Sequence, residues 1–264
     1  MRALIFAAGL GTRLKPITDT LPKALVPVCS QPLLKHLITK LSGAGFTDIV
    51  INVHHFADKI REYVAQNRNF GLNISFSDET DLLRETGGGI KHAAPLFPGQ
   101  EPFLVHNVDI LSNLDLEEFY EAHMASSISA DTPLATLLVS SRKTARYLLF
   151  DNGNNLVGWM NVLSGEVKSP YSELVRSASE NFDAEKFLQE NKLKKYAFAG
   201  THVISPEIFN IMQGCGEKFP IIDFYLQIAD KYIIKGFVKE DLKMVDVGKL
   251  DTIKEAEDFL NERE

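Results

Sequence analysis

The 264-residue sequence has little of several features that mark particular classes of protein. It contains only two cysteines, Cys29 and Cys215, which are too few for a disulfide framework and form no CxxC pair of the kind that binds zinc. No apolar run approaches the roughly 18 residues that a membrane-spanning helix needs. The first residues lack the apolar region and the cleavage site of a signal peptide. We therefore expect a protein of the reducing cytoplasm with no membrane partner.

Positive charge is also scarce, because 28 lysines and arginines stand against 35 aspartates and glutamates, for a net charge of −7. A nucleic-acid groove normally shows a basic face, so we expect no nucleic-acid partner. A small polyanionic ligand would need a few placed cations, a metal ion, or both. The length is near the upper limit for one hydrophobic core, and we expect a single domain over residues 1–264.

The first half of the chain alternates between strand and helix patterns. We predict strands at residues 3–8, 48–53, 72–76 and 102–106. Helices are predicted to begin at Gln31-Pro32, at residue 56 and within residues 85–90. This spacing predicts parallel βαβ units, in which ligands bind at the carboxyl ends of the strands.

The second half has a different pattern. Three strands, at 132–140, 145–151 and 155–160, are predicted to form a meander with a hairpin turn at "DNGNN". Residues 164–195 are polar and predict a loop with a helix near 184–190. After it we predict a strand at 196–204, helices at 206–212 and 220–230, short strands near 233–238 and 243–247, and a helix from about 250. The fold class is therefore α/β, with a mixed sheet flanked by helices.

The stretch "FAAGLGTRLKPITDTLPKAL", residues 6–25, places Gly9 and Gly11 directly after the first strand. A dinucleotide fingerprint would need a third glycine where Leu14 stands, and a P-loop would need a glycine at the same position. Both common phosphate loops are excluded. What remains is a longer loop, stiffened by prolines, that wraps around a ligand.

Three cations belong to this loop: Arg13, Lys15 and Lys23. In one interpretation, backbone N–H groups from Gly9 to Thr12 bind phosphate oxygens while Arg13 and Lys23 reach in from either end. In the other, the stretch is a glycine-rich turn with solvated cations. The sequence leaves the role of Lys15 open between phosphate binding and solvent exposure.

Two aspartates follow predicted strands at distant points of the chain. Asp109 ends "NVD" after the strand at 102–106, and Asp246 lies in "VDVG" near the C-terminus. A Mg²⁺ ion bound together with substrate phosphates usually takes one or two carboxylates, so the two could share one ion. A single aspartate at such a position is more commonly a helix cap or a turn residue.

The segment "ETGGGI", residues 85–90, is a second glycine cluster. Three consecutive glycines at a helix start would let the backbone approach a flat base or ribose, with Thr86 as a hydrogen-bonding wall. A tight strand-to-helix turn explains the same residues. The segment alone does not separate these two interpretations.

The combination of these motifs resembles the sugar-1-phosphate nucleotidyltransferases. The stretch "AAGLGTRLKPITDTLPKALVPV" is similar to the family signature, and Asp109 and Asp246 match its metal-binding aspartates. "ETGGGI" and the compact length look closest to the N-acetylmuramate-1-phosphate uridylyltransferase type, and the mannose-1-phosphate guanylyltransferase type is next. The resemblance implies a Rossmann-like, mainly parallel sheet without a β-helix domain. It divides the chain into a nucleotide-binding half (1–130), a sugar-phosphate half (131–248) and a C-terminal helix (249–264).

The resemblance also implies the reaction, in which a nucleoside triphosphate and a sugar 1-phosphate give a nucleotide-sugar and pyrophosphate. Arg13 would hold the departing phosphates, Lys23 would lie between the reacting phosphates, and Asp109 and Asp246 would bind Mg²⁺. The implied nucleotide-binding residues are Ala8, Gly9, Gly11, Thr12, Thr86, Gly87 and Asn107. Those implied for the sugar phosphate are Asn161, Gly200 and Thr201.

Several alternatives stay open. The chain could instead be a guanylyltransferase for mannose or heptose 1-phosphate, or a catalytically idle relative that binds nucleotide-sugar and regulates a partner. A glycosyltransferase is disfavoured because no D-x-D motif ends a strand. The "EKP" element of many relatives is missing, "GWMN" stands in its neighbourhood, and Val108 replaces a smaller residue. Residues 164–195 could be a lid or an oligomer contact, and both a monomer and a dimer remain open.

Overall fold

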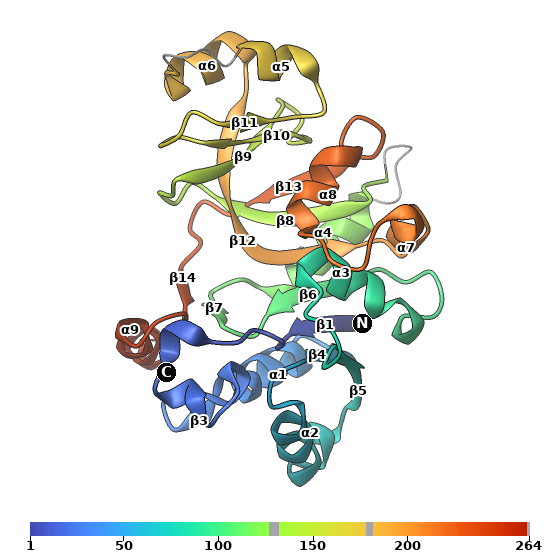
Figure 1. Ribbon diagram of the computed structural model, residues 1–264, viewed down its shortest axis with the longest axis vertical. Helices are drawn as coiled ribbons and strands as arrows, with labels where there is room; N and C mark the ends of the chain where they lie inside the picture. The colour runs from blue at the N-terminus through green and yellow to red at the C-terminus, as the bar shows by residue number, and fades with distance from the viewer. Residues whose placement is uncertain (127–131, 178–181, 263–264) are drawn as a thin grey trace.

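A mixed β-sheet runs through the molecule, whose computed structural model describes residues 1–126, 132–177 and 182–262 (Figure 1). The described residues form ten strands of this sheet in the order β11-β10-β9-β12-β6-β1-β4-β5, with β8 joined to β12 and β13 joined to β8. Helices flank it, so the α/β class and the mixed sheet are confirmed.

Parallel strands make up the part of the sheet formed by the first half of the chain. The strands are β1 (Arg2–Phe6), β4 (Asp48–Val53), β5 (Asn73–Asp78) and β6 (Phe103–Asn107). They are linked through α1 (Leu33–Gly43), α2 (Ala57–Gln66) and α3 (Glu85–His92). All four strands were predicted, to within a few residues at each end. Because they are parallel, their carboxyl ends lie along one edge of the sheet.

Antiparallel pairing dominates the later part. The long strand β12 (Lys194–Ile204) pairs with β6, with β8 (Ala135–Ser140) and with β9 (Arg146–Phe150). The hairpin of β9 with β10 (Leu156–Asn161) is confirmed, but the predicted three-strand meander is wrong. The first residues of β12 pair with β9 and its last ones with β6, while β8 pairs with β12 on both sides of a register irregularity between Phe198 and His202.

The polar stretch 164–195 contains β11 (Val167–Lys168), α5 (Ser172–Ser177) and α6 (Ala184–Asn191), which lie at the end of the molecule far from α1 and α2 (Figure 1). The predicted helix at 184–190 is confirmed. Residues 178–181 of this stretch fall outside the described residues.

Both faces of β1, β4 and β6 are buried, whereas β5, at the edge of the sheet, is mostly part-exposed. Along β1, Ala3 and Ile5 belong to a core that also includes residues of α1, α2, α4 (Leu116–Ser126) and α9 (Asp251–Asn261). Leu4 points to the opposite core, which α3, α7 (Ile208–Ile211) and α8 (Ile221–Ile228) cover. Strands covered on two faces are mainly apolar, which is why β1, β4 and β6 appear as hydrophobic runs whereas β5 alternates between polar and apolar residues.

Short elements complete the edge where the strands end. The loop after β1 contains three 3₁₀ turns, at Thr12–Leu14, Ile17–Asp19 and Lys23–Leu25, followed by β2 (Pro27–Val28) and β3 (Gln31–Pro32). After β13 (Ile234–Val238), the strand β14 (Met244–Asp246) pairs with β7 (Ile110–Ser112). This pairing returns the end of the chain to the carboxyl end of β6. No helix in the described ranges has both the length and the apolar character to cross a bilayer.

Candidate active site

A cavity of about 480 Å³ lies at the carboxyl ends of the parallel strands. Its walls come from the loop after β1, the ends of β4, β5 and β6, the start of α3 and residue Gly248. Most of the predicted site residues line it, namely Ala8, Gly9, Gly11, Thr12, Arg13, Lys23, Thr86, Asn107 and Asp109. Residues from Phe6 to Gly248 thus meet in one hollow.

The loop after β1 is shaped by Gly11. Its φ is +64°, and a Cβ atom there would lie 2.9 Å from the Thr18 methyl group, so a side chain would be both strained and crowded. The Gly11 carbonyl accepts hydrogen bonds from the Thr18 hydroxyl (2.8 Å) and the Leu14 N–H (2.9 Å). Across the described residues, no acceptor takes the backbone N–H groups of residues 9–13. A row of unpaired N–H groups at a cavity wall suits the oxygens of a phosphate chain.

Lys23 and Asp109 form an ion pair in this cavity. Lys23 begins the 3₁₀ turn Lys23–Leu25 and is only 8% exposed, and its Nζ donates to Oδ2 of Asp109. Asp109 follows β6, where Val108 donates its N–H to the Phe6 carbonyl (3.1 Å) and holds the turn against β1. The pair therefore fixes a cation and an anion side by side at the carboxyl end of the sheet.

The other two cations of the loop differ from Lys23 and from each other. Arg13 has no carboxylate partner within the described part of the chain, and its Nη2 lies 2.8 Å from the position that a Cβ atom of Gly248 would take. Lys15 pairs with Asp19 at 3.0 Å on the surface and does not line the cavity. Such exposed pairs contribute about 0.2–1 kcal/mol to stability. Only Arg13 and Lys23 are thus placed to meet a ligand.

Asp246 lies beside the cavity rather than in its lining. It ends β14 opposite Ile110, and the next N–H, of Val247, donates to the Asp109 carbonyl at 2.8 Å. Its Oδ1 lies 3.0 Å from the point where a Gly248 Cβ would stand, so Asp246 and Arg13 flank this glycine. The described residues hold no cluster of three or more potential metal ligands. Two carboxylates without a third ligand fit Mg²⁺, which usually completes its shell with waters and substrate phosphates.

The glycines of α3 pack closely against other parts of the protein, and the nucleotide-binding role implied for Gly87 stays a prediction. A Cβ atom on Gly87 would lie 2.4 Å from the Phe219 ring, and one on Gly88 would lie 2.1 Å from the Glu217 carbonyl oxygen. Gly87 is buried and does not line the cavity. Thr86 does line it, although its Oγ1 also accepts the N–H of Ile221 (3.0 Å) at the start of α8.

None of the three residues predicted for the sugar phosphate lines this cavity. Asn161 closes a turn at the end of β10, where its Oδ1 accepts the Leu163 N–H at 3.0 Å. Thr201 is fully buried because its register places it opposite His106 within the sheet. Gly200 is nearer to the cavity, because a Cβ atom there would lie 2.7 Å from Nδ2 of Asn107, a lining residue. Its φ is +77°.

The sequence interpretation missed several residues of the cavity, above all Asn52 and Glu79. Asn52 is the one polar residue of the apolar segment "IVINV", and it is 1% exposed. Glu79 directly follows β5, as Asp109 follows β6, and is also 1% exposed. Burial raises the pKa of the Glu79 carboxyl above its ordinary value. A polar residue at a strand end is the feature by which both could have been found.

Comparisons with known proteins agree with this geometry. Residues 2–149 match the Nucleotidyl transferase family. The N-acetylmuramate alpha-1-phosphate uridylyltransferase of Caulobacter vibrioides is 30% identical over 244 residues, which cover 92% of this chain and 90% of that protein. The protein of the same name from Neisseria meningitidis is 42% identical over 128 residues, which cover 48% of this chain and 54% of that protein.

A mannose-1-phosphate guanyltransferase of Hypocrea jecorina is 38% identical over 127 residues, 47% of this chain and 35% of that protein. Among solved structures, a putative glucose-1-phosphate thymidylyltransferase from Bacillus anthracis has a TM-score of 0.75 at 17% identity. It covers 98% of this chain and 95% of that chain, and at this identity it shows the shared fold. The family match, the full-length relative and the cavity at the strand ends together show that the chain belongs to the nucleotidyl transferase family, among the sugar-1-phosphate nucleotidyltransferases.

Proposed function

We propose that the protein transfers a uridylyl group from UTP to an amino-sugar 1-phosphate such as N-acetylmuramate 1-phosphate, releasing pyrophosphate. The observation that carries this proposal is the composition of the cavity. It is lined by unpaired backbone N–H groups, by Arg13 and by the Lys23–Asp109 ion pair. The choice of uracil and of the sugar is supported by the similarity to the Caulobacter relative along nearly the whole chain.

Positioning and charge stabilisation supply the catalysis. The nucleophile is a phosphate oxygen of the sugar 1-phosphate, which is already ionised at neutral pH, so no general base is required. Arg13, which has no carboxylate partner among the described residues, binds the departing β- and γ-phosphates through its guanidinium fork. Lys23, held in place by Asp109, lies between the sugar phosphate and the α-phosphate and reduces their repulsion.

Asp109 and Asp246 are the residues that would hold a Mg²⁺ ion, and the ion would neutralise charge on the reacting phosphates. Asp109 has a further role without the ion, because its Oδ2 orients the Lys23 ammonium. Asp246 is kept near it by the β7–β14 pairing.

Pyrophosphate release from a set of nucleoside triphosphates, each combined with a panel of sugar 1-phosphates in the presence of Mg²⁺, tests this proposal. We expect turnover with UTP and N-acetylmuramate 1-phosphate, and its loss when the metal is chelated. Turnover with GTP and mannose or heptose 1-phosphate instead would favour the guanylyltransferase function. Binding of nucleotide-sugar without turnover of any pair would identify a regulatory subunit.

Gly248→Ala is expected to lower kcat/KM without unfolding the protein. The added methyl group would stand 2.8 Å from Arg13 Nη2 and 3.0 Å from Asp246 Oδ1, and both are ends of flexible side chains that can move aside. Displacing Arg13 by about 1 Å should cost roughly 10- to 100-fold in kcat/KM. Steady-state kinetics and thermal unfolding measure the two effects.

Gly214→Ala is the matched control, because a Cβ atom there meets no atom within 4 Å. It should change neither kcat/KM nor the melting temperature appreciably. If Gly248→Ala had wild-type kinetics, the contact between Gly248 and Arg13 would have no catalytic importance.

A further inference from the structure

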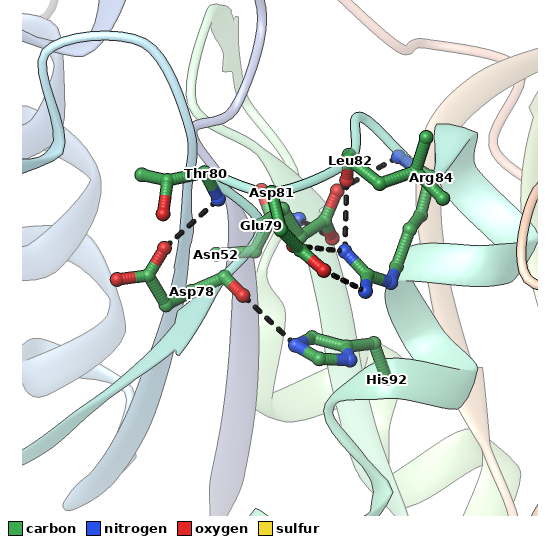
Figure 2. A network of polar contacts seen from close by, with 8 residues as sticks. All are labelled: Asn52, Asp78, Glu79, Thr80, Asp81, Leu82, Arg84 and His92. Carbon is green, nitrogen blue, oxygen red and sulfur yellow. Dashed lines mark hydrogen bonds and ion pairs between the residues drawn. The ribbon is translucent and has the colours of Figure 1, made fainter.

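Asn52 and Glu79 form a buried polar pair in the wall of the cavity, and the mechanism above uses neither. Figure 2 shows them within a network of polar contacts between β4, β5 and the segment that leads into α3. One carboxylate oxygen of Glu79, Oε1, accepts a hydrogen bond from Asn52 Nδ2. The other, Oε2, accepts the backbone N–H of Arg84 at 3.1 Å. Both carboxylate oxygens are thus occupied by donors of the protein itself.

Asn52 connects this carboxylate to the loop after β1. Its Oδ1 accepts the N–H of Ala7 at 3.2 Å and the N–H of Ala8 at 3.0 Å. The bond to Glu79 determines which way the Asn52 amide faces, because only its NH₂ group can donate to a carboxylate. The loop therefore leaves the sheet at a point fixed by Asn52, and its unpaired N–H groups begin at the next residue, Gly9.

The surroundings of the pair are built to keep it in place. A Cβ atom on Gly89 would lie 2.8 Å from Glu79 Oε1 and 3.2 Å from Asn52 Nδ2, so the third glycine of "ETGGGI" makes room for these two side chains. The segment after Glu79 is closed by the Arg84 guanidinium, which donates to both Asp81 oxygens (2.7 and 2.8 Å) and to the Leu82 carbonyl (2.8 Å) (Figure 2).

Burying a carboxylate costs stability because the charge loses its hydration. An apolar pair of similar volume would fill the same space at lower cost. We propose that Asn52 and Glu79 are positioning residues, which set the direction of the unpaired N–H groups of residues 9–13 toward the triphosphate. This inference rests on the proposed function of the cavity. Neither side chain needs to contact the reacting atoms, because both act through the backbone of Ala7 and Ala8.

The geometry explains why position 79 holds glutamate rather than glutamine. Two donors, from Asn52 and Arg84, are bound by two different oxygens of the same carboxylate. In Glu79→Gln one of these oxygens becomes an NH₂ group, which faces a donor. Either the Arg84 contact is lost or the Asn52 amide turns over and presents NH₂ to the N–H groups of Ala7 and Ala8.

An exchange of the two groups gives a sharp test. In the double variant Asn52→Asp/Glu79→Gln, the introduced amide can donate to the introduced carboxylate while its oxygen accepts the Arg84 N–H. The second oxygen of the introduced carboxylate then accepts the Ala7 and Ala8 N–H groups. All four hydrogen bonds and the total charge are restored, with the charge moved from position 79 to position 52.

Three quantities are measured for the full chain and each variant: the Kd of UTP by calorimetry, kcat and KM for pyrophosphate release, and the melting temperature. We expect Glu79→Gln to weaken UTP binding and lower kcat/KM by roughly 10- to 100-fold, the scale of a misplaced binding group. The double variant should return to within about 5-fold of wild type, since its contacts are complete. A merely structural role would move the melting temperature without this recovery of Kd.

Gly89→Ala supplies a second perturbation if the charged variants do not fold. Its methyl group presses on the pair and should raise the Kd of UTP by about 10-fold, whereas Gly43→Ala, with no atom within 4 Å of the added Cβ, should leave it unchanged. Wild-type affinity in Glu79→Gln, or a folded double variant no better than Glu79→Gln, would overturn the inference. A wild-type protein that binds UTP but releases no pyrophosphate would instead contradict the proposed function alone.

Discussion

Lys23→Ala is expected to lower kcat/KM for pyrophosphate release by roughly 100- to 1,000-fold, the usual effect of removing one preorganised charge-stabilising group. The reaction joins two phosphates, and their repulsion is the barrier that a fixed cation reduces. Lys23 is suited to this because it is 8% exposed and already oriented by Asp109. A cation held in place before the substrates bind costs no reorganisation during the reaction.

Lys15→Ala is the matched control for this variant. Lys15 belongs to the same loop and carries the same charge, but it pairs with Asp19 on the surface and lies outside the cavity lining. We expect its loss to change kcat/KM by less than about 3-fold, since such pairs contribute little. Near-normal activity in Lys23→Ala would contradict the role given to Lys23. An equal loss in Lys15→Ala would show that the loop acts only through its general charge.

Asp109→Asn should also lose most of its activity, because it loses a potential metal ligand and the anion that orients Lys23. Separating a charged hydrogen-bonded pair costs about 1.5–3 kcal/mol, so both variants should unfold at lower temperature than wild type. Kinetics are therefore measured well below the melting temperature of each variant. A parallel measurement of UTP binding separates loss of substrate affinity from loss of turnover.

The part of the site that could be predicted from the sequence is the part fixed by local order along the chain. Gly9 and Arg13 lie in the loop after β1 and Asp109 lies just after β6, and the parallel arrangement of those strands brings their carboxyl ends together. Chain order and strand type thus suffice to place them at one edge. The roles assigned to them remain predictions that the kinetic experiments address.

The part that could not be predicted depends on register and on contacts between distant elements. The insertion of β12 between β9 and β6, which breaks the predicted meander, and the pairing of Thr201 with His106 both depend on contacts between distant strands. The glycines of "ETGGGI" are explained by Phe219, Glu217 and Glu79, which come from other elements. The position of Asn52 and Glu79 at strand ends is visible in the sequence, but the hydrogen bonds that they make to the loop after β1 and to Arg84 are not.

The second large effect is expected in the stability of the protein below pH 6.5. Burial lowers the pKa of His106 and of His123 to about 4, and that of His202 to about 3. Each of these rings is at most 2% exposed. His123 contacts the Thr136 and Ser205 hydroxyls at 2.8 and 3.1 Å, and His202 contacts the Tyr225 hydroxyl at 2.9 Å. All three are therefore neutral in the folded protein at pH 5.

The sign follows from proton binding in the two states. In the unfolded chain these histidines titrate near their ordinary pKa of 6.5, so between pH 6.5 and 4 the unfolded state binds more protons. The free energy of unfolding then falls as the pH falls through this window. Because pH 5 lies about 1.5 units below the unfolded-state pKa, each histidine lowers the free energy of unfolding at that pH by roughly 2 kcal/mol. The raised pKa of Glu79 has the opposite effect, because the folded state then binds the extra proton and the free energy of unfolding rises as the pH falls.

Denaturant unfolding of wild type at pH 8 and pH 5, compared with His123→Gln/His202→Gln, measures this contribution. The glutamines do not titrate, so the difference in unfolding free energy between the two pH values should shrink by about 4 kcal/mol in the double variant. Any stability that the substitutions cost at both pH values cancels in this difference, and His106, beside the candidate active site, is left unchanged. An equally steep fall in the double variant would assign the acid sensitivity to other groups. The expected result would make acid unfolding a property of buried histidines in α4 and β12, separate from the charges of the loop after β1.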